Sequence, residues 1–313
     1  MNLFSRWLIF VKERFEPVSH TVMIFAFASA NAAIAYAVSP FAVKERALYL
    51  SGGFMLVWLI FFHMRLFDDI KDYETDRLVN KGRPLPRGVL TINEFGAGIL
   101  LCVITEIALS FTLGFKIFST YALVLAFTLI MRQEFFIGDW MRPKMELYAA
   151  THTFSASMLG LLIYSTLNNA FITEIPPAYL YAAFGNWFVF NVFEFGRKTF
   201  SIDEEREGVD SYSLRLSPFG AFALLAANIF FAFTMLFLCT GKINQEALKG
   251  GPTNFMPMLL SAALVSFMVI CAGMVYSRKP SDFNAKFYRG AVSFYLVAYH
   301  LVISICGLIF FGR

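Results

Sequence analysis

Long apolar segments alternate with short polar stretches over the whole length of the chain. Each segment has the roughly 20 residues that a helix needs to cross a bilayer. They lie near residues 18–39, 47–67, 95–114, 117–137, 147–167, 178–200, 217–240, 256–276 and 291–311. Little more than Phe115 and Lys116 separates the third from the fourth, which predicts a tight hairpin. The pattern therefore predicts an all-α polytopic membrane protein, with about nine transmembrane helices in a single domain over residues 1–313.

The N-terminal residues 1–16 have a different pattern. Charged residues such as Arg6 and Lys12 are interspersed with Phe4, Trp7 and Phe10. A helix with one apolar and one charged face is typical of segments that lie on a membrane surface. We expect such a surface helix here. A simple extension of the first span is the alternative.

Composition and charge agree with a membrane protein. The chain is 58% hydrophobic and 15% charged, with a mean hydropathy of +0.62. Most of its 26 lysines and arginines lie in the N-terminal segment and in the loops after spans 2, 4, 6 and 8. The positive-inside rule then places these loops in the cytoplasm and the C-terminus outside. We expect the membrane to be the inner membrane of a bacterium. The basic residues flank the spans, so we expect a lipid bilayer, and no nucleic acid, as partner.

An acidic cluster follows the second apolar span. Taking Asp68 as zero on a helix, Asp72 falls near ~40°, Asp76 near ~80° and Asp69 near ~100°, with Arg65 at ~60°. Like charges on one face repel, so the four carboxylates need a cation to neutralise them. Carboxylates of this kind suit Mg²⁺, which also binds substrate phosphates. We therefore expect Asp68, Asp69, Asp72 and Asp76 to bind Mg²⁺, and the metal to bridge to a diphosphate.

Basic residues in the same group of loops could bind that diphosphate. Positive-inside anchoring alone explains most of them. The candidates closest to carboxylates are Arg65, Arg132, Arg197 and Lys198, and Lys81 and Arg83 stand behind them.

The end of the sixth span carries a second polar site. Taking Glu194 as zero, Lys198 lies near ~40° and Asn191 near ~60° on a helix. The three side chains therefore share a face, four spans after the first site, and such spacing hints at a duplicated four-helix unit. His63 and His152 could also line a cavity, although satisfied interior histidines are the simpler interpretation.

Two stretches resemble the UbiA superfamily of intramembrane prenyltransferases. The first motif of that family is N-D-x-x-D-x-x-x-D, followed by R-P-x-P-x-G. Here residues 68–76 read DDIKDYETD and residues 80–88 read NKGRPLPRG. Residues 208–216, GVDSYSLRL, resemble a G-V-x-S-x-S-x-R-L stretch that follows the family's second motif. Together with the nine spans, the resemblance covers nearly the whole chain.

The resemblance implies a ring of nine helices around a central cavity, with a cytoplasmic cap formed by loops 2–3 and 6–7. It also implies transfer of a prenyl group from a prenyl diphosphate, with Mg²⁺ as cofactor, to an aromatic or other lipophilic acceptor. Asp69, Asp72, Arg65 and Lys198 are then the expected catalytic residues. The chain departs from the family at Asp68, where an asparagine is usual. It departs further at the second motif, where Arg197 and Lys198 replace carboxylates, so we expect these two residues to contact diphosphate directly.

Two other functions fit parts of the pattern. A terpene cyclase of the same superfamily would use the same diphosphate site without an external acceptor. A membrane carrier or permease could use intramembrane carboxylates as an ion path. Its polar sites would lie near the midplane rather than at one edge, which argues against the carrier.

Overall fold

The computed structural model describes residues 1–246 and 254–310, and within them all regular secondary structure is helical. The predicted end of the last span, at residue 311, lies outside this part. The helices are α1 (Leu3–Arg14), α2 (Pro17–Val38), α3 (Arg46–Lys71), α4 (Tyr73–Val79), α5 (Ile92–Leu113), α6 (Phe115–Arg132), α7 (Gly138–Met141), α8 (Met145–Thr153), α9 (Ser155–Asn168), α10 (Pro177–Arg197), α11 (Tyr212–Glu246), α12 (Met256–Arg278) and α13 (Asp282–Phe310). Short 3₁₀ turns cover Glu134–Phe136, Ile172–Glu174 and Ile202–Glu204.

The predicted spans correspond to long helices. Among the described residues, seven are long and apolar enough to cross a membrane: α2, α3, α5, α6, α11, α12 and α13. The sixth predicted span is α10, and the fifth is the α8–α9 pair, which breaks at Phe154. The chain is therefore a multi-pass, all-helical membrane protein, as the apolar pattern predicted.

Local sequence explains where several helices begin and end. Thr91 and Glu94 form a capping box at the start of α5, which satisfies otherwise free amides of the first turn. Pro177 occupies the first turn of α10, where its missing amide costs nothing. Gly114 alone separates α5 from α6, with φ 145°, a conformation that glycine adopts readily. The predicted hairpin is therefore confirmed.

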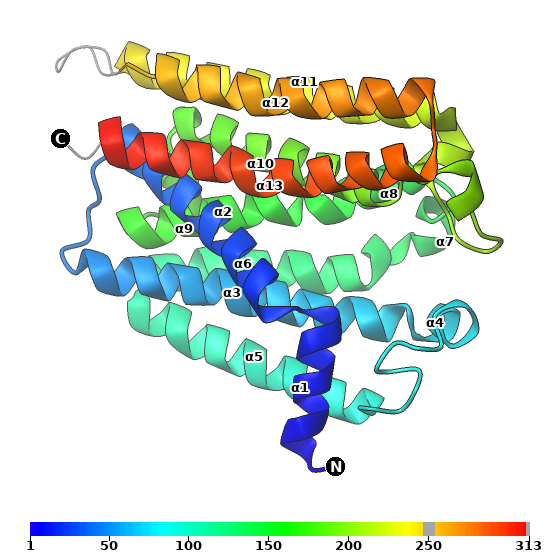
Figure 1. The fold of residues 1–313 in the computed structure, drawn as a ribbon. Helices are drawn as coiled ribbons and strands as arrows, with labels where there is room; N and C mark the ends of the chain where they lie inside the picture. Colours follow the sequence, from blue (N-terminus) through cyan, green and yellow to red (C-terminus); the bar gives the residue numbers. More distant parts are fainter. Residues whose placement is uncertain (247–253, 311–313) are drawn as a thin grey trace.

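The membrane helices run roughly parallel to one another (Figure 1), and their contacts close into a ring. Within the described chain, each helix packs on the next in the order α2, α3, α5, α6, α9, α10, α11, α12 and α13, and α13 packs back on α2. Helix α10 also contacts α2 and α13, and α9 also contacts α2 and α3. Helices α9 and α10 therefore lie towards the inside of the bundle. The ring predicted by the family resemblance is confirmed.

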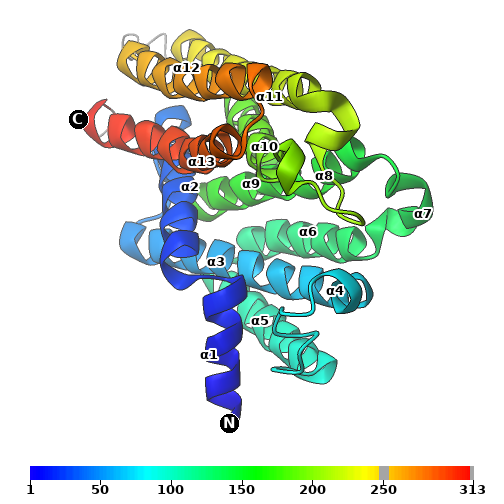
Figure 2. The ribbon, with the colours of Figure 1, turned by 45° about the vertical axis from the view of Figure 1, so that its right-hand side comes forward.

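Polar segments gather at one end of the ring, which we call the α4 end (Figures 1 and 2). Helices α4, α7 and α8 lie there, together with the loop before α11. Helix α1 runs across the direction of the spans, and its Trp7 and Phe10 pack on Phe95 of α5. Phe4 and Leu8 on its other side are exposed. That α1 lies on the membrane surface, and that the α4 end lies in the cytoplasm, both stay predictions.

Candidate active site

A cavity of about 700 Å³ opens within the ring near the α4 end. One part of its lining is charged: Arg14, Arg65, Asp68, Lys71, Asp72, Glu194, Arg197 and Lys198. The other part is mostly apolar and includes Met23, Phe61, Met64, Phe190, Leu296 and Val297. The ends of α3 and α10, which carry the two predicted polar sites, therefore meet at one cavity.

The acidic motif does not lie on a single helix. Helix α3 ends at Lys71, Asp72 is its C-terminal cap, and α4 begins at Tyr73. Among the four aspartates, Asp68 and Asp72 line the cavity, one turn apart. The expectation that all four share one helical arc is wrong, because the chain changes direction between Asp72 and Asp76.

The other two aspartates are engaged by cations. Asp69 is buried and accepts hydrogen bonds from Nε of Arg14 at 2.9 Å and Nε of Arg65 at 3.0 Å. Both arginines line the cavity, so Asp69 fixes two cations at its wall. Asp76 is also buried, accepts from Asn80 at 2.9 Å, and pairs with Arg83.

A chain of polar contacts links the acidic motif to the loop after α6. Lys71 Nζ lies 3.5 Å from Asp68 and donates to the Tyr148 hydroxyl at 2.8 Å. That hydroxyl donates to Glu134 at 3.1 Å, and Glu134 also accepts from Arg142. Burial opposes ionisation of Glu134, but the hydrogen bonds from Arg142 and Tyr148 outweigh it and lower its pKa. Lys71 is therefore held in the cavity from two sides.

The backbone that presents Glu134 is strained. Residues 134–136 have φ values of 51°, 56° and 58°, the left-handed region that residues with a side chain seldom occupy. Strain of this kind persists only where the surrounding structure enforces it. Here the contacts of Glu134 with Arg142 and Tyr148 provide that support.

Asp72 has an electrostatic environment suited to a cation. Burial raises its pKa, and the neighbouring Asp68 and Asp76 raise it further against the opposing charge of Lys71. A bound cation would relieve this cost of ionisation. Asp72 and Asp68 thus form a pair of cavity carboxylates whose negative charge is only partly offset by Lys71.

At the second polar site, at the end of α10, the cations outnumber the carboxylates. Glu194 lines the cavity and pairs with Arg197 and Lys198, whose Nζ lies 3.4 Å from the carboxylate. Asn191 does not line the cavity, because it is buried between helices, where it donates to Asn228 at 3.1 Å and accepts from Thr153. The predicted common face of Asn191, Glu194 and Lys198 is therefore divided between the cavity and a helix interface.

Several predicted diphosphate ligands lie elsewhere. Lys81 and Arg132 are exposed, and the Arg132 guanidinium lies over the Phe67 ring at 5.0 Å. Arg83 is occupied by Asp76. None of the three lines the cavity. Arg65, Arg197 and Lys198 do line it, as the sequence predicted for diphosphate ligands.

His152 lines the cavity at the border between its charged and apolar parts. Its Nδ1 lies 2.7 Å from the carbonyl oxygen of Tyr148. Because a carbonyl only accepts, Nδ1 carries the proton and Nε2 keeps a free lone pair. That Nε2 is buried without a hydrogen-bond partner. His152 can therefore accept a proton from a molecule bound beside it.

His63 has a different place. It lies outside the cavity, fully buried, with Nδ1 2.8 Å from Glu106, and Glu106 also accepts from Tyr121 at 2.9 Å. These residues join α3, α5 and α6, so this histidine belongs to a helix interface.

Three further residues line the cavity that the sequence did not predict there: Arg14, Lys71 and Tyr148. Arg14 and Lys71 looked like ordinary basic residues flanking a span. The spacing of Lys71, three residues after Asp68 and one before Asp72, was the available signal for its position. Nothing local distinguished Tyr148 from the other tyrosines.

The loop between α10 and α11 covers the α4 end. Ser211 and Ser213, from the second resembling stretch, both donate to Glu205. Glu204 pairs with Arg289 of α13 at 2.6 Å. Hydrogen bonds from Arg289 lower the pKa of Glu204 to about 2. Side chains of the loop itself thus attach this cap to the ring.

The donors at the cavity fit a magnesium ion bound in part by substrate. Within residues 1–246 and 254–310, no three acidic, histidine or cysteine side chains are grouped to enclose a metal by themselves. Mg²⁺ commonly takes one or two carboxylates and completes its shell with waters and substrate phosphates. Asp68 and Asp72 provide two such ligands, and adjoining cations could receive a phosphate group.

The helical ring is similar in fold to solved structures of membrane proteins. The chain matches no protein-family model and no curated protein. Among solved structures, it resembles a UbiA homologue from Aeropyrum pernix K1 with a TM-score of 0.65, at 16% identity, over 93% of this chain and 97% of that one. It resembles a digeranylgeranylglyceryl phosphate synthase with a TM-score of 0.60, at 14% identity, over 99% and 100% of the two chains.

A third similar structure is a UbiA homologue from Archaeoglobus fulgidus bound to GPP and Mg²⁺. Its TM-score is 0.52, at 12% identity, over 96% of this chain and 99% of that one. The protein thus has the fold of an intramembrane helical ring. More particularly, this is the fold of the UbiA prenyltransferases, which the motif resemblance predicted.

Proposed function

We propose that the chain is a Mg²⁺-dependent intramembrane prenyltransferase, which transfers a prenyl group from prenyl diphosphate to an aromatic or other lipophilic acceptor. One observation carries the proposal: carboxylates and cations gather in one part of a cavity whose other part is mostly apolar. A prenyl diphosphate has the matching polarity, with a charged head and an apolar tail. The UbiA fold supports the same substrate, since one solved structure with this fold binds GPP and Mg²⁺.

The cations supply the diphosphate site. Arg14, Arg65, Lys71, Arg197 and Lys198 line the cavity close to Asp68 and Asp72. Arginine binds phosphate oxygens with paired donors and lysine binds them as a point charge. We assign these residues to the diphosphate, and Asp68 and Asp72 to the metal. Mg²⁺, when bound there, would neutralise charge that develops on the leaving diphosphate.

The chemistry follows from this placement. The bond between C1 of the prenyl group and the diphosphate oxygen breaks, and its electron pair leaves with the diphosphate. The acceptor forms a bond to C1 and loses a proton, which His152 Nε2 takes up. The apolar part of the cavity, which includes Phe61 and Phe190, keeps water away from the bound prenyl group.

A substrate screen tests the proposal. Purified protein in lipid nanodiscs is given Mg²⁺ with geranyl, farnesyl or geranylgeranyl diphosphate, with and without phenolic and prenylglycerol-phosphate acceptors. Diphosphate release and organic products are followed together. Release that needs Mg²⁺ and yields a prenylated acceptor supports the transferase. Hydrocarbon products without acceptor would identify a cyclase, and a folded protein that releases no diphosphate would contradict both.

The proposal extends to the surroundings of the protein. The basic residues at the α4 end favour a cytoplasmic active site, because positive loops stay inside. The lipophilic acceptor would then enter from the bilayer, and the charged donor from the cytoplasm.

A further inference from the structure

On four of the helices that line it, the cavity extends several turns in from the α4 end. Its deepest lining residues include Met23 of α2, Phe61 of α3, Phe190 of α10 and Val297 of α13. One turn further from the α4 end, Phe27 is fully buried and lines no cavity. A layer of side chains therefore closes the cavity inside the membrane.

Three phenylalanines form most of this layer, which we call the aromatic floor: Phe27, Phe61 and Phe190. The rings of Phe61 and Phe190 are stacked, with centroids 5.9 Å apart and an angle of 20° between planes. Phe27 packs edge-on against both, at 6.2 Å and 5.6 Å. Aromatic pairs in these geometries are attractive and well fixed.

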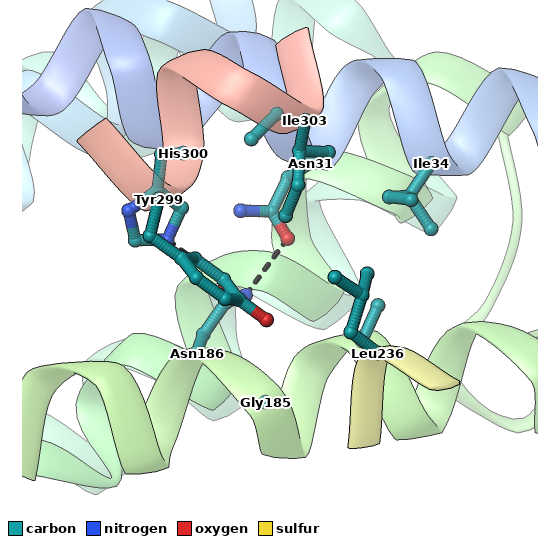
Figure 3. Close-up of a pocket in the computed structure, with 10 residues that line it drawn as sticks. Asn31, Ile34, Gly185, Asn186, Leu236, Tyr299, His300 and Ile303 are labelled. Carbon is teal, nitrogen blue, oxygen red and sulfur yellow. Dashed lines mark hydrogen bonds between the residues drawn. The ribbon is translucent and has the colours of Figure 1, made fainter. Parts of the chain in front are cut away.

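A small pocket borders Phe27 of the aromatic floor, and Figure 3 shows the residues that line it. His300 packs on Phe27 at 5.4 Å and lines this pocket with Asn31 and Asn186. Asn186 donates to the Asn31 side chain at 2.8 Å, the dashed line in Figure 3. The pocket has a volume of only about 20 Å³, enough for one water. The polar side chains there already pair with one another, and His300 Nε2 lies 3.3 Å from the Asn186 side-chain oxygen. A prenyl tail that passed the aromatic floor would have to separate them and leave buried polar groups without partners.

The helices give the depth of the cavity above the aromatic floor. At 1.5 Å per residue, Asp72 lies roughly 16 Å from Phe61 along α3, and Lys198 lies roughly 12 Å from Phe190 along α10. An extended chain advances roughly 1.2 Å per bond, so one four-bond isoprene unit spans about 5 Å. The distance from the charged rim to the floor therefore holds two to three isoprene units.

We propose that the aromatic floor limits the prenyl donor to about three isoprene units, so that geranyl and farnesyl diphosphate are the preferred donors. The inference rests on the proposed function and specifies its donor. Phe61 and Phe190 are the specificity-determining residues, because their rings end the path of the tail. Longer tails must bend or leave the cavity between helices, and their binding is weaker.

Diphosphate release with Mg²⁺ tests the inference without knowledge of the acceptor. We expect kcat/KM to fall at least tenfold between farnesyl and geranylgeranyl diphosphate. Phe61→Ala or Phe190→Ala opens the floor, so the ratio of geranylgeranyl to farnesyl turnover should rise at least fivefold. Phe61→Leu removes the ring with less loss of volume and should move the ratio in the same direction. Phe193→Ala, which widens the cavity nearer its rim, is the matched control and should leave the ratio unchanged.

The outcomes separate the two proposals. If the wild-type protein releases no diphosphate from any donor, the proposed function fails and the inference with it. If it releases diphosphate equally well from geranylgeranyl and farnesyl diphosphate, the function stands and the inference is overturned. The inference is also overturned if the wild-type protein prefers farnesyl over geranylgeranyl diphosphate but Phe61→Ala, Phe190→Ala and Phe61→Leu all leave that preference unchanged.

Discussion

The C-terminal ends of α3 and α10 reach the same cavity with opposite charge. At α3, Asp68 and Asp72 line the cavity, with Lys71 as their cationic neighbour. At α10, the single carboxylate of Glu194 is shared by Arg197 and Lys198. The two helix ends thus offer a surplus of carboxylate at α3 and a surplus of cation at α10. The comparison indicates a division of labour, with metal at the first end and diphosphate at the second.

The physical reason is competition for the carboxylates. A metal ion must displace or outcompete the cations that already neutralise a carboxylate. Glu194 has two such partners, whereas Asp72 lies near carboxylates that raise its pKa. The same reasoning separates the four aspartates, because Asp69 and Asp76 each have arginine partners.

The largest expected effect comes from the carboxylates at the first end. Asp72→Asn should lower diphosphate release roughly 10³-fold, because the site loses charge that holds the metal at the leaving group. The measurement is kcat at saturating substrate and Mg²⁺. Asp76→Asn is the matched control, and its loss should be much smaller. A greater loss in Asp76→Asn would contradict the assignment.

His152 lies between the two ends and belongs to neither charged group. His152→Gln keeps the size of the side chain but removes its base, so transfer to the best acceptor from the screen should fall roughly 10²-fold. Diphosphate release without acceptor should fall less, since ionisation needs no base. Added imidazole should restore part of the transfer to His152→Ala. Equal loss of transfer and release would argue for a structural role.

The second end should act mainly on substrate affinity. Lys198→Ala removes a charged hydrogen-bond donor, and the KM for prenyl diphosphate should rise roughly tenfold. Arg132→Ala is the comparison, because Arg132 is exposed and lies outside the cavity. Its KM should change less than that of Lys198→Ala. A larger rise in KM for Arg132→Ala than for Lys198→Ala would instead support the prediction from sequence that Arg132 binds diphosphate.

A substitution at Asp69 tests whether this residue binds the metal or only positions Arg14 and Arg65. If Asp69 only positions Arg14 and Arg65, Asp69→Asn should raise the KM for prenyl diphosphate about fivefold. The Mg²⁺ concentration that gives half-maximal rate should stay near the wild-type value. A Mg²⁺ requirement that rises as much as in Asp72→Asn would place Asp69 among the metal ligands.

The smallest expected effect concerns the loop between α10 and α11, which forms the cap beside the end of α10. The pKa of Glu204 is lowered to about 2 by Arg289, so its stabilising contribution is complete above the ordinary value of 4.5 and is lost as pH falls towards 2. Glu204→Gln should cost about 1 kcal/mol at pH 7. The difference in Tm from the wild-type protein should persist at pH 5 and vanish near pH 2. Glu207→Gln, at an exposed position in the same loop, should show no such difference.

The sequence predicted the spans and the hairpin, because each depends on local pattern and helix length. The central cavity was implied only by the family resemblance. The sequence could not predict the break between Lys71 and Tyr73, where no glycine or proline marks a helix end. It also could not assign Asp69 to its partners, since Arg14 lies 55 residues earlier and reaches it only after α1 folds across the ring. Lys81 and Arg132 were chosen by their place in the loops, and the direction of a side chain at a helix end depends on tertiary packing.

Metal binding at the two ends is the most direct test of the central claim. Mn²⁺ can substitute for Mg²⁺, and its binding can be followed by electron paramagnetic resonance in the presence of inorganic diphosphate. The wild-type protein and Glu194→Gln should bind Mn²⁺ with similar affinity, while Asp72→Asn should lose most of its binding. Loss of binding in Glu194→Gln, with binding kept in Asp72→Asn, would contradict the assignment of the metal to the end of α3.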